Sequence, residues 1–294
     1  MQLSVPLYIM SGFKLHIINF DFYGGDVNAF VLETEHFVFL IDNAVGSARS
    51  SIRKVLKGTA LDRKKLMVLN THAHWDHASL NGFLKEQYGA TILGHPKALE
   101  LCDKEQQYEI VYRRYADYCP AESSVYWDEF AYPAPPDSFL HGGECFEDDG
   151  FRLRVIHTPG HSADSLSFFE ENSKLLFAGD AVQGNGFDGN APYYCDAEGY
   201  ITSLEKLLPL KPKSVFCGHG MVQGEAEADA FLRLSVEKFE AIDATVHAAA
   251  EAAVPDAQLV STLAADLAKR FGYPETMHIY TTVKAHVARL RAEV

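Results

Sequence analysis

The chain has 294 residues, a hydrophobic content of 47% and a formal net charge of −14. This length is enough for one large core plus an appendage, and the hydrophobic content is ordinary for a globular protein. The acidic balance argues against a nucleic-acid substrate, because phosphate contacts require a basic surface.

No apolar run reaches membrane-spanning length, and the N-terminus lacks the basic region of a signal peptide. We therefore expect no membrane contact. The five cysteines are odd in number and show no metal-type pair spacing, which predicts reduced thiols in a cytoplasmic protein.

The predicted elements alternate between strands and helices along the chain. Residues 14–41 have a strand-rich pattern with a turn at Gly24-Gly25, and buried strands are expected at 66–69, 152–156, 175–178 and 214–217. Helices are expected at 47–57, 76–88 and 97–118, then along apolar stripes at 232–246, 260–271 and after Pro274.

Four metal-ligand side chains, His72, His74, Asp76 and His77, follow the apolar strand 66–69 directly. Loops on a rigid scaffold are the usual place for catalytic groups. Asp76 and His77 are adjacent and point in different directions, so one ion cannot easily use all four. A pair of ions could, with His72 and His74 facing one and Asp76 and His77 the other.

An isolated histidine is more often structural than a ligand. We assign no role to seven of the 13: His16, His36, His95, His141, His247, His278 and His286. The cluster at 72–77 is different, because metal binding supplies the attraction that closely packed imidazoles and a carboxylate otherwise lack.

Three later positions repeat one pattern, in which a strand is followed by a glycine and then a ligand-type residue. These are Gly160-His161, Gly179-Asp180 and Gly218-His219. Glycine permits the tight turn that brings a backbone close to a metal. Each of these signals is weak alone, but all three following the cluster at 72–77 in this order strongly indicate further ligands for the same metal site.

Taken together, Thr-His-x-His-x-Asp-His, Thr-Pro-Gly-His-Ser, Ala-Gly-Asp and Gly-His-Gly resemble the metallo-β-lactamase superfamily, especially its glyoxalase II-like and lactonase-like hydrolases. The resemblance implies an α/β fold, a four-layered αββα sandwich. We expect a catalytic domain at 1–224 with an inserted helical and aromatic segment at about 97–140, and a helical C-terminal extension at 225–294.

The resemblance also implies ligand roles. His72, His74 and His161 would hold one metal, Asp76, His77 and His219 would hold a second, and Asp180 would bridge them. Asp42 and His157 match positions that support ligand orientation. Imidazole and carboxylate ligands suit two Zn²⁺ ions best, and Fe or Mn are also compatible.

The expected function is hydrolysis of a small-molecule thioester, lactone or ester by a metal-bound hydroxide, with Asp76 moving the proton to the leaving group. One alternative is a mononuclear iron enzyme of the sulfur dioxygenase type, using His72, His161 and Asp180. Others are a phosphodiesterase of the same fold and a binding protein without activity.

Aromatic residues near the ligands are candidate substrate contacts: Trp75, Tyr193 and Tyr194 beside the metals, and Tyr126 and Trp127 in the insert. A tyrosine there could stabilise an oxyanion, or it could pack beneath the loop. The insert could roof the site or pack on the core. The stripes of the C-terminal helices also allow a homodimer.

Overall fold

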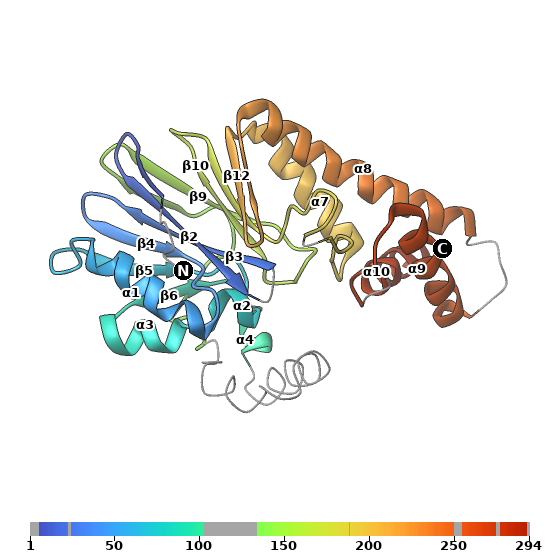
Figure 1. Ribbon diagram of the computed structural model, residues 1–294, viewed down its shortest axis with the longest axis horizontal. Coiled ribbons are helices and arrows are strands. Elements are labelled where there is room, and N and C mark those ends of the chain that lie inside the picture. Colours follow the sequence, from blue (N-terminus) through green and yellow to red (C-terminus); the bar gives the residue numbers. More distant parts are fainter. Residues whose placement is uncertain are drawn as a thin grey trace. The chain divides into compact units, whose positions relative to one another are not determined.

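Figure 1 shows the computed structural model, which describes residues 6–22, 25–102, 134–187, 189–249, 255–274 and 277–292. The chain divides into two compact units. The first comprises Met1–Ile156 and Phe168–Ser173, and the second comprises His157–Ser167 and Lys174–Val294. The division into domains at residue 224 stays a prediction.

The first unit contains a seven-stranded sheet whose strands follow chain order. These strands are β1 (Leu7–Ile9), β2 (Lys14–Phe22), β3 (Gly25–Glu33), β4 (Phe37–Ile41), β5 (Lys65–Leu69), β6 (Thr91–Gly94) and β7 (Ser138–Phe139). Pairing is antiparallel from β1 to β4 and parallel from β4 to β7. Because β4 and β5 run parallel, with Ile41 opposite Leu69, the loops after them leave from the same edge.

Apolar side chains hold this sheet on both faces. On one face, α1 (Arg49–Lys57) and α3 (Asn81–Tyr88) contribute Ile52, Leu56 and Leu84 to a buried cluster with strand residues such as Leu40 and Val68. Burying an aliphatic side chain of this size contributes about 1.5–3 kcal/mol.

On the other face, the ring of Phe39 packs on Phe146 and Phe151, with centroids 5.4 and 5.5 Å away. These rings belong to β8 (Cys145–Asp148) and β9 (Phe151–His157), which pair antiparallel. The strands of the second sheet lie in the order β13-β12-β11-β10-β9-β8.

In the second unit, two parallel strands directly precede the candidate ligands Asp180 and His219. β11 (Leu175–Gly179) pairs with β12 (Ser214–Cys217), and β13 (Met221–Gln223) adds an antiparallel strand. β10 (Leu166–Glu170) and β11 are buried along their whole length, and β11 has the continuous apolar sequence that predicts such burial.

The described part of the second unit also contains the helices α7 (Ala197–Leu207), α8 (Glu225–Ala249), α9 (Asp256–Phe271) and α10 (Met277–Ala292). The last three share a buried cluster that includes Ile242, Leu263 and Val283, so the apolar stripes do face one another. An α/β fold with a helical C-terminal extension is therefore confirmed. Within the described ranges, no helix has the length and apolar character to cross a membrane.

The expected helix at 76–88 is interrupted. The structure has α2 (Trp75–Ala78) and then α3, with Leu80 between them. The amide of Leu80 donates to Oδ1 of Asn43 at 2.7 Å, and this side-chain acceptor replaces a helical carbonyl. Of the helix expected at 97–118, α4 (Ala98–Leu101) is present, and residues 103–133 lie outside the described part.

Candidate metal centre

Asp42 organises the ligand loop of the first unit. It follows β4, and its backbone adopts a left-handed conformation with φ of 54°, which is costly for a residue with a Cβ. Its amide donates to the carbonyl of Leu69 at the end of β5, across a 3.0 Å distance. The side chain is thereby turned towards the loop that follows β5.

Three donors converge on the buried Asp42 carboxylate. Thr71 donates its amide to Oδ1 (2.7 Å) and its hydroxyl to Oδ2 (2.8 Å), and Nδ1 of His77 lies 3.0 Å from Oδ2. Burial raises the pKa of Asp42, and the hydrogen bonds from His77 and Thr71 oppose that rise. Because Nδ1 of His77 is held by an oxygen, Nε2 is the nitrogen left for a metal.

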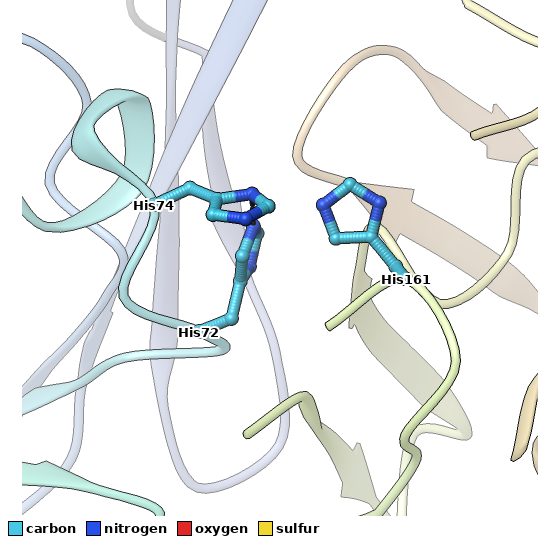
Figure 2. Close-up of side chains that lie close together, drawn as sticks. All are labelled: His72, His74 and His161. Atoms are coloured by element: carbon cyan, nitrogen blue, oxygen red, sulfur yellow. Dashed lines mark hydrogen bonds between the residues drawn. The ribbon is translucent and has the colours of Figure 1, made fainter. Parts of the chain in front are cut away.

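The imidazoles of His72 and His74 face each other from one loop (Figure 2), with Nε2 of His72 2.9 Å from Nδ1 of His74. Nδ1 of His72 lies 3.0 Å from the Thr71 hydroxyl, which in turn donates to Asp42. The chain of hydrogen bonds therefore orients His72 as well as His77. Oδ2 of Asp76 lies 3.7 Å from Nε2 of His77.

A network of three asparagines supports the same loop. Asn81 accepts from Asn43 at 2.7 Å and donates to Asn70 at 2.8 Å, and all three side chains are buried. The amide of Asn43 donates to the carbonyl of His77 at 2.8 Å. Sequence reasoning missed this network, because asparagines far apart in the chain carry no local signal.

In the second unit, Asp180 lies between two histidines. Its Oδ2 is 3.4 Å from Nε2 of His161 and 3.5 Å from Nε2 of His219. Asp180 follows β11 and His219 follows β12, and these strands end at one edge because they are parallel. One carboxylate oxygen with an imidazole nitrogen on each side is an arrangement suited to cation binding.

His161 is fixed by the segment around Tyr193. Its Nδ1 lies 2.9 Å from the Tyr193 carbonyl oxygen, so Nδ1 carries the proton and Nε2 presents a lone pair. The Gln183 side chain donates to that same carbonyl (2.6 Å) and accepts from the Tyr193 amide (2.7 Å). Gln183 was not predicted, since a lone glutamine after Asp180 has no distinguishing pattern.

The remaining residues predicted from the sequence are one supporting histidine and four aromatic candidates for substrate contact. His157 is the last residue of β9, and its Nε2 lies 3.2 Å from the Ala163 carbonyl oxygen. Trp75 is the first residue of α2. Tyr194 is fully buried, which agrees with packing rather than substrate contact. Tyr126 and Trp127 lie outside the described residues.

The Cys217 thiol precedes the Gly218-His219 turn and is buried. Burial raises its pKa well above the usual range, and the charge of Asp180 adds to the rise. The thiol therefore stays protonated and donates to the Val182 carbonyl at 3.5 Å. Among the residues that the structure covers, Cys102, Cys145, Cys195 and Cys217 form no disulfide bond.

The donor set fits a transition metal, since the candidate ligands offer imidazole nitrogens and carboxylate oxygens. His77 and His161 each have one ring nitrogen held by an oxygen, which is the usual arrangement behind a metal-bound histidine. Each unit therefore carries a preorganised group of ligand side chains.

Comparison with known proteins places this ligand pattern in a family. The family model for the metallo-β-lactamase superfamily matches residues 22–219. A solved structure of a metallo-β-lactamase family protein from Thermus thermophilus is similar, with a TM-score of 0.67 and 25% identity, over 95% of this chain and 93% of that one.

Two curated relatives carry names that describe activities. Hydroxyacylglutathione hydrolase GloC of Haemophilus influenzae is 27% identical over 60% of this chain and 76% of its own length. Atrochrysone carboxyl ACP thioesterase of Aspergillus fumigatus is 26% identical over 66% of this chain and 51% of its own length.

For several other curated relatives, the match spans about half of the relative's length or less. The family model, in contrast, covers most of this chain, including the segments that carry all the proposed ligands. The fold and the order of ligand motifs agree with that match. The chain belongs to the metallo-β-lactamase superfamily.

Proposed function

We propose that this protein is a metal-dependent hydrolase of small-molecule thioesters, lactones or esters. The observation that carries the proposal is the position of Asp180 Oδ2, 3.4 Å from His161 Nε2 and 3.5 Å from His219 Nε2. Two curated relatives named as a thioesterase and as a hydrolase of hydroxyacylglutathione support the substrate class.

We assign the ligands from the family pattern and from the side-chain geometry within each unit. By that pattern, His72, His74 and His161 would hold one ion, and Asp76, His77 and His219 would hold the other. Asp180 would be shared by both, and Zn²⁺ is the proposed metal at each position.

Bound metal would supply a water whose pKa is lowered towards about 7 and would polarise the substrate carbonyl. The protein's own side chains orient the ligands and transfer the proton. Asp42 and Thr71 hold the imidazoles of His77 and His72 in fixed orientations. Asp76 is partly exposed, so its carboxylate can accept the proton of the attacking water and pass it to the leaving group.

The net charge of −14 favours small neutral or acyl substrates over polyanions, because long-range repulsion slows the approach of nucleic acid. We therefore propose a small-molecule substrate and no nucleic-acid partner. Among the candidate contacts named from the sequence, Trp75 and Tyr193 are partly exposed, and we propose these two as substrate contacts.

The test compares two isosteric substitutions of buried carboxylates. Asp180→Asn should lose zinc and hydrolysis together. Glu170→Gln is the matched control, because Glu170 is also buried and accepts the backbone amides of Arg152, Asn172 and Ser173. Zinc content is measured by elemental analysis, and hydrolysis with a panel of acyl thioesters, lactones, phosphodiesters and short RNA.

We expect close to two zinc ions per wild-type chain and turnover of thioesters or lactones. Efficient RNA or phosphodiester cleavage with weak ester hydrolysis would contradict the substrate class. One iron per chain, with oxygen uptake in the presence of persulfides, would instead indicate the mononuclear dioxygenase.

A further inference from the structure

We propose that Thr282 and His286, two buried residues of α10, are positioning residues for the metal ligand His161. They act through the segment Pro192–Tyr194, whose central carbonyl accepts the hydrogen bond from His161. The proposal rests on the proposed function, because it takes His161 to be a ligand. It gives the C-terminal helix a role in the metal centre of the second unit.

The first step is the contact between His161 and Tyr193. Nδ1 of His161 lies 2.9 Å from the Tyr193 carbonyl, and the two rings meet edge to face with centroids 5.3 Å apart. The direction of the His161 ring, and with it the position of Nε2 near Asp180, therefore depends on where the Tyr193 backbone lies. Gln183 holds that backbone from the side of β11.

The second step is Thr282, which holds the peptide groups on both sides of Tyr193. Its hydroxyl donates to the Pro192 carbonyl at 2.6 Å and accepts from the Tyr194 amide at 3.3 Å. The Thr282 side chain is fully buried, so water cannot easily replace either bond. Without the hydroxyl, two buried backbone groups next to Tyr193 would lose their partner.

The third step is His286, which holds the Tyr194 side chain. The phenolic oxygen lies 2.7 Å from Nε2 of His286, and Nδ1 of His286 lies 2.8 Å from Oδ1 of Asp243 on α8. The Tyr194 ring also stacks on Tyr200 of α7, with centroids 4.1 Å apart. The segment is thus tied to α7, α8 and α10 together.

The protonation states agree with this chain of hydrogen bonds. Burial raises the pKa of Tyr194 well above its usual range, so the phenol keeps its proton and donates to Nε2 of His286. Burial lowers the pKa of His286, so the neutral ring can accept at Nε2 and donate from Nδ1 to Asp243. The donor and acceptor roles along this chain of hydrogen bonds are therefore compatible with one another.

His161 is therefore oriented by a helix more than 100 residues later in the chain, through one carbonyl. Partners that orient a metal-bound histidine typically change metal affinity by about 10–100-fold when they are removed. Removing the contacts of Thr282 or His286 should therefore change the metal affinity and the tautomer of His161, and these changes should exceed those caused by an equal loss of stability.

The main variant is Thr282→Val, which keeps the shape and removes the hydroxyl. It should weaken zinc binding by about tenfold or more, measured by titrating metal-free protein with zinc against a competing chelator. Thr282→Ser retains the hydroxyl and should bind zinc as wild type does. Val283→Ala is the stability control, because Val283 is fully buried on the same helix in the apolar cluster of α8, α9 and α10.

A second readout needs no metal. Long-range ¹H–¹⁵N spectra of the metal-free protein should show His161 as the Nδ1–H tautomer in wild type and in Val283→Ala. Thr282→Val should shift His161 towards a mixture of tautomers. If Thr282→Val does not fold, Tyr194→Phe removes only the phenolic oxygen and should move both readouts in the same direction.

The proposal fails if Thr282→Val, or Tyr194→Phe in its place, matches Val283→Ala in zinc affinity and His161 tautomer. If the wild type binds zinc and these variants bind it with the same affinity, the positioning role alone is overturned. If the wild type binds no transition metal, the proposed function is overturned and, with it, this inference.

Discussion

Replacing Asp42 with asparagine should separate the ligand-orienting role of this residue from its role in folding. The carboxylate accepts from the Thr71 amide and hydroxyl and from Nδ1 of His77. An asparagine oxygen in the Oδ1 position keeps the bond from the Thr71 amide. Its NH₂ group then occupies the Oδ2 position and faces Nδ1 of His77 with a donor instead of an acceptor.

The magnitude follows from these contacts. The His77 ring is fully buried. Either its Nδ1–H group stays opposite the NH₂ group of the new asparagine, which leaves two donors in contact, or the ring proton moves to Nε2. Loss of a hydrogen bond to a charged group should lower the free energy of unfolding by about 1.5–3 kcal/mol. A proton on Nε2 blocks the nitrogen proposed as the ligand, and such changes behind a metal-bound histidine weaken metal binding by about 10–100-fold. The corresponding loss of binding free energy is about 1.4–2.8 kcal/mol.

The assay pairs urea unfolding of metal-free protein with zinc titration against a chelator. Glu170→Gln serves as the control, since it changes a buried carboxylate that contacts no proposed ligand. We expect both variants to lose stability and only Asp42→Asn to lose zinc affinity. Wild-type zinc affinity in a folded Asp42→Asn protein would refute the argument that Asp42 sets the tautomer of His77.

Two further predictions concern stability. The Asp148 carboxylate raises the pKa of His36 through a 2.8 Å hydrogen bond, so the stability it supplies is present below about pH 6.5 and is lost as the pH rises through the folded-state pKa. His36→Ala should therefore destabilise the protein more at about pH 5.5 than at about pH 8.5 in urea unfolding, and an equal loss at both would contradict the sign. Gly160→Ala should lower the free energy of unfolding by about 3 kcal/mol or more, because φ is 142° and an added Cβ would lie 2.5 Å from Cα of Tyr200. Gly272→Ala is the control, because φ is 73° and no atom lies within 4 Å of the added Cβ, so it should lower the free energy of unfolding by only about 1–2 kcal/mol. Similar urea midpoints for the two variants would contradict a steric cost specific to residue 160.

The sequence alone determined those features that depend on neighbours in the chain. The strands at 66–69, 175–178 and 214–217 and the three C-terminal helices follow from local apolar patterns, which the structure confirms. The ligand-type residues after the strands were visible for the same reason, since a loop that leaves a strand end carries its residues to a sheet edge. The family followed from the order of those motifs, and its match is confirmed.

Tertiary structure decided which distant groups meet. The break between α2 and α3 depends on Asn43, a residue that lies 37 positions away from Leu80. Gln183 has no sequence signal, and its role appears only because its side chain spans the amide and carbonyl of Tyr193. The sequence gives His286 no role, yet folding places it against Tyr194, 92 positions away. Local periodicity specifies which face of an element is buried, but hydrogen-bond partners across the fold exist only after packing brings their backbones together.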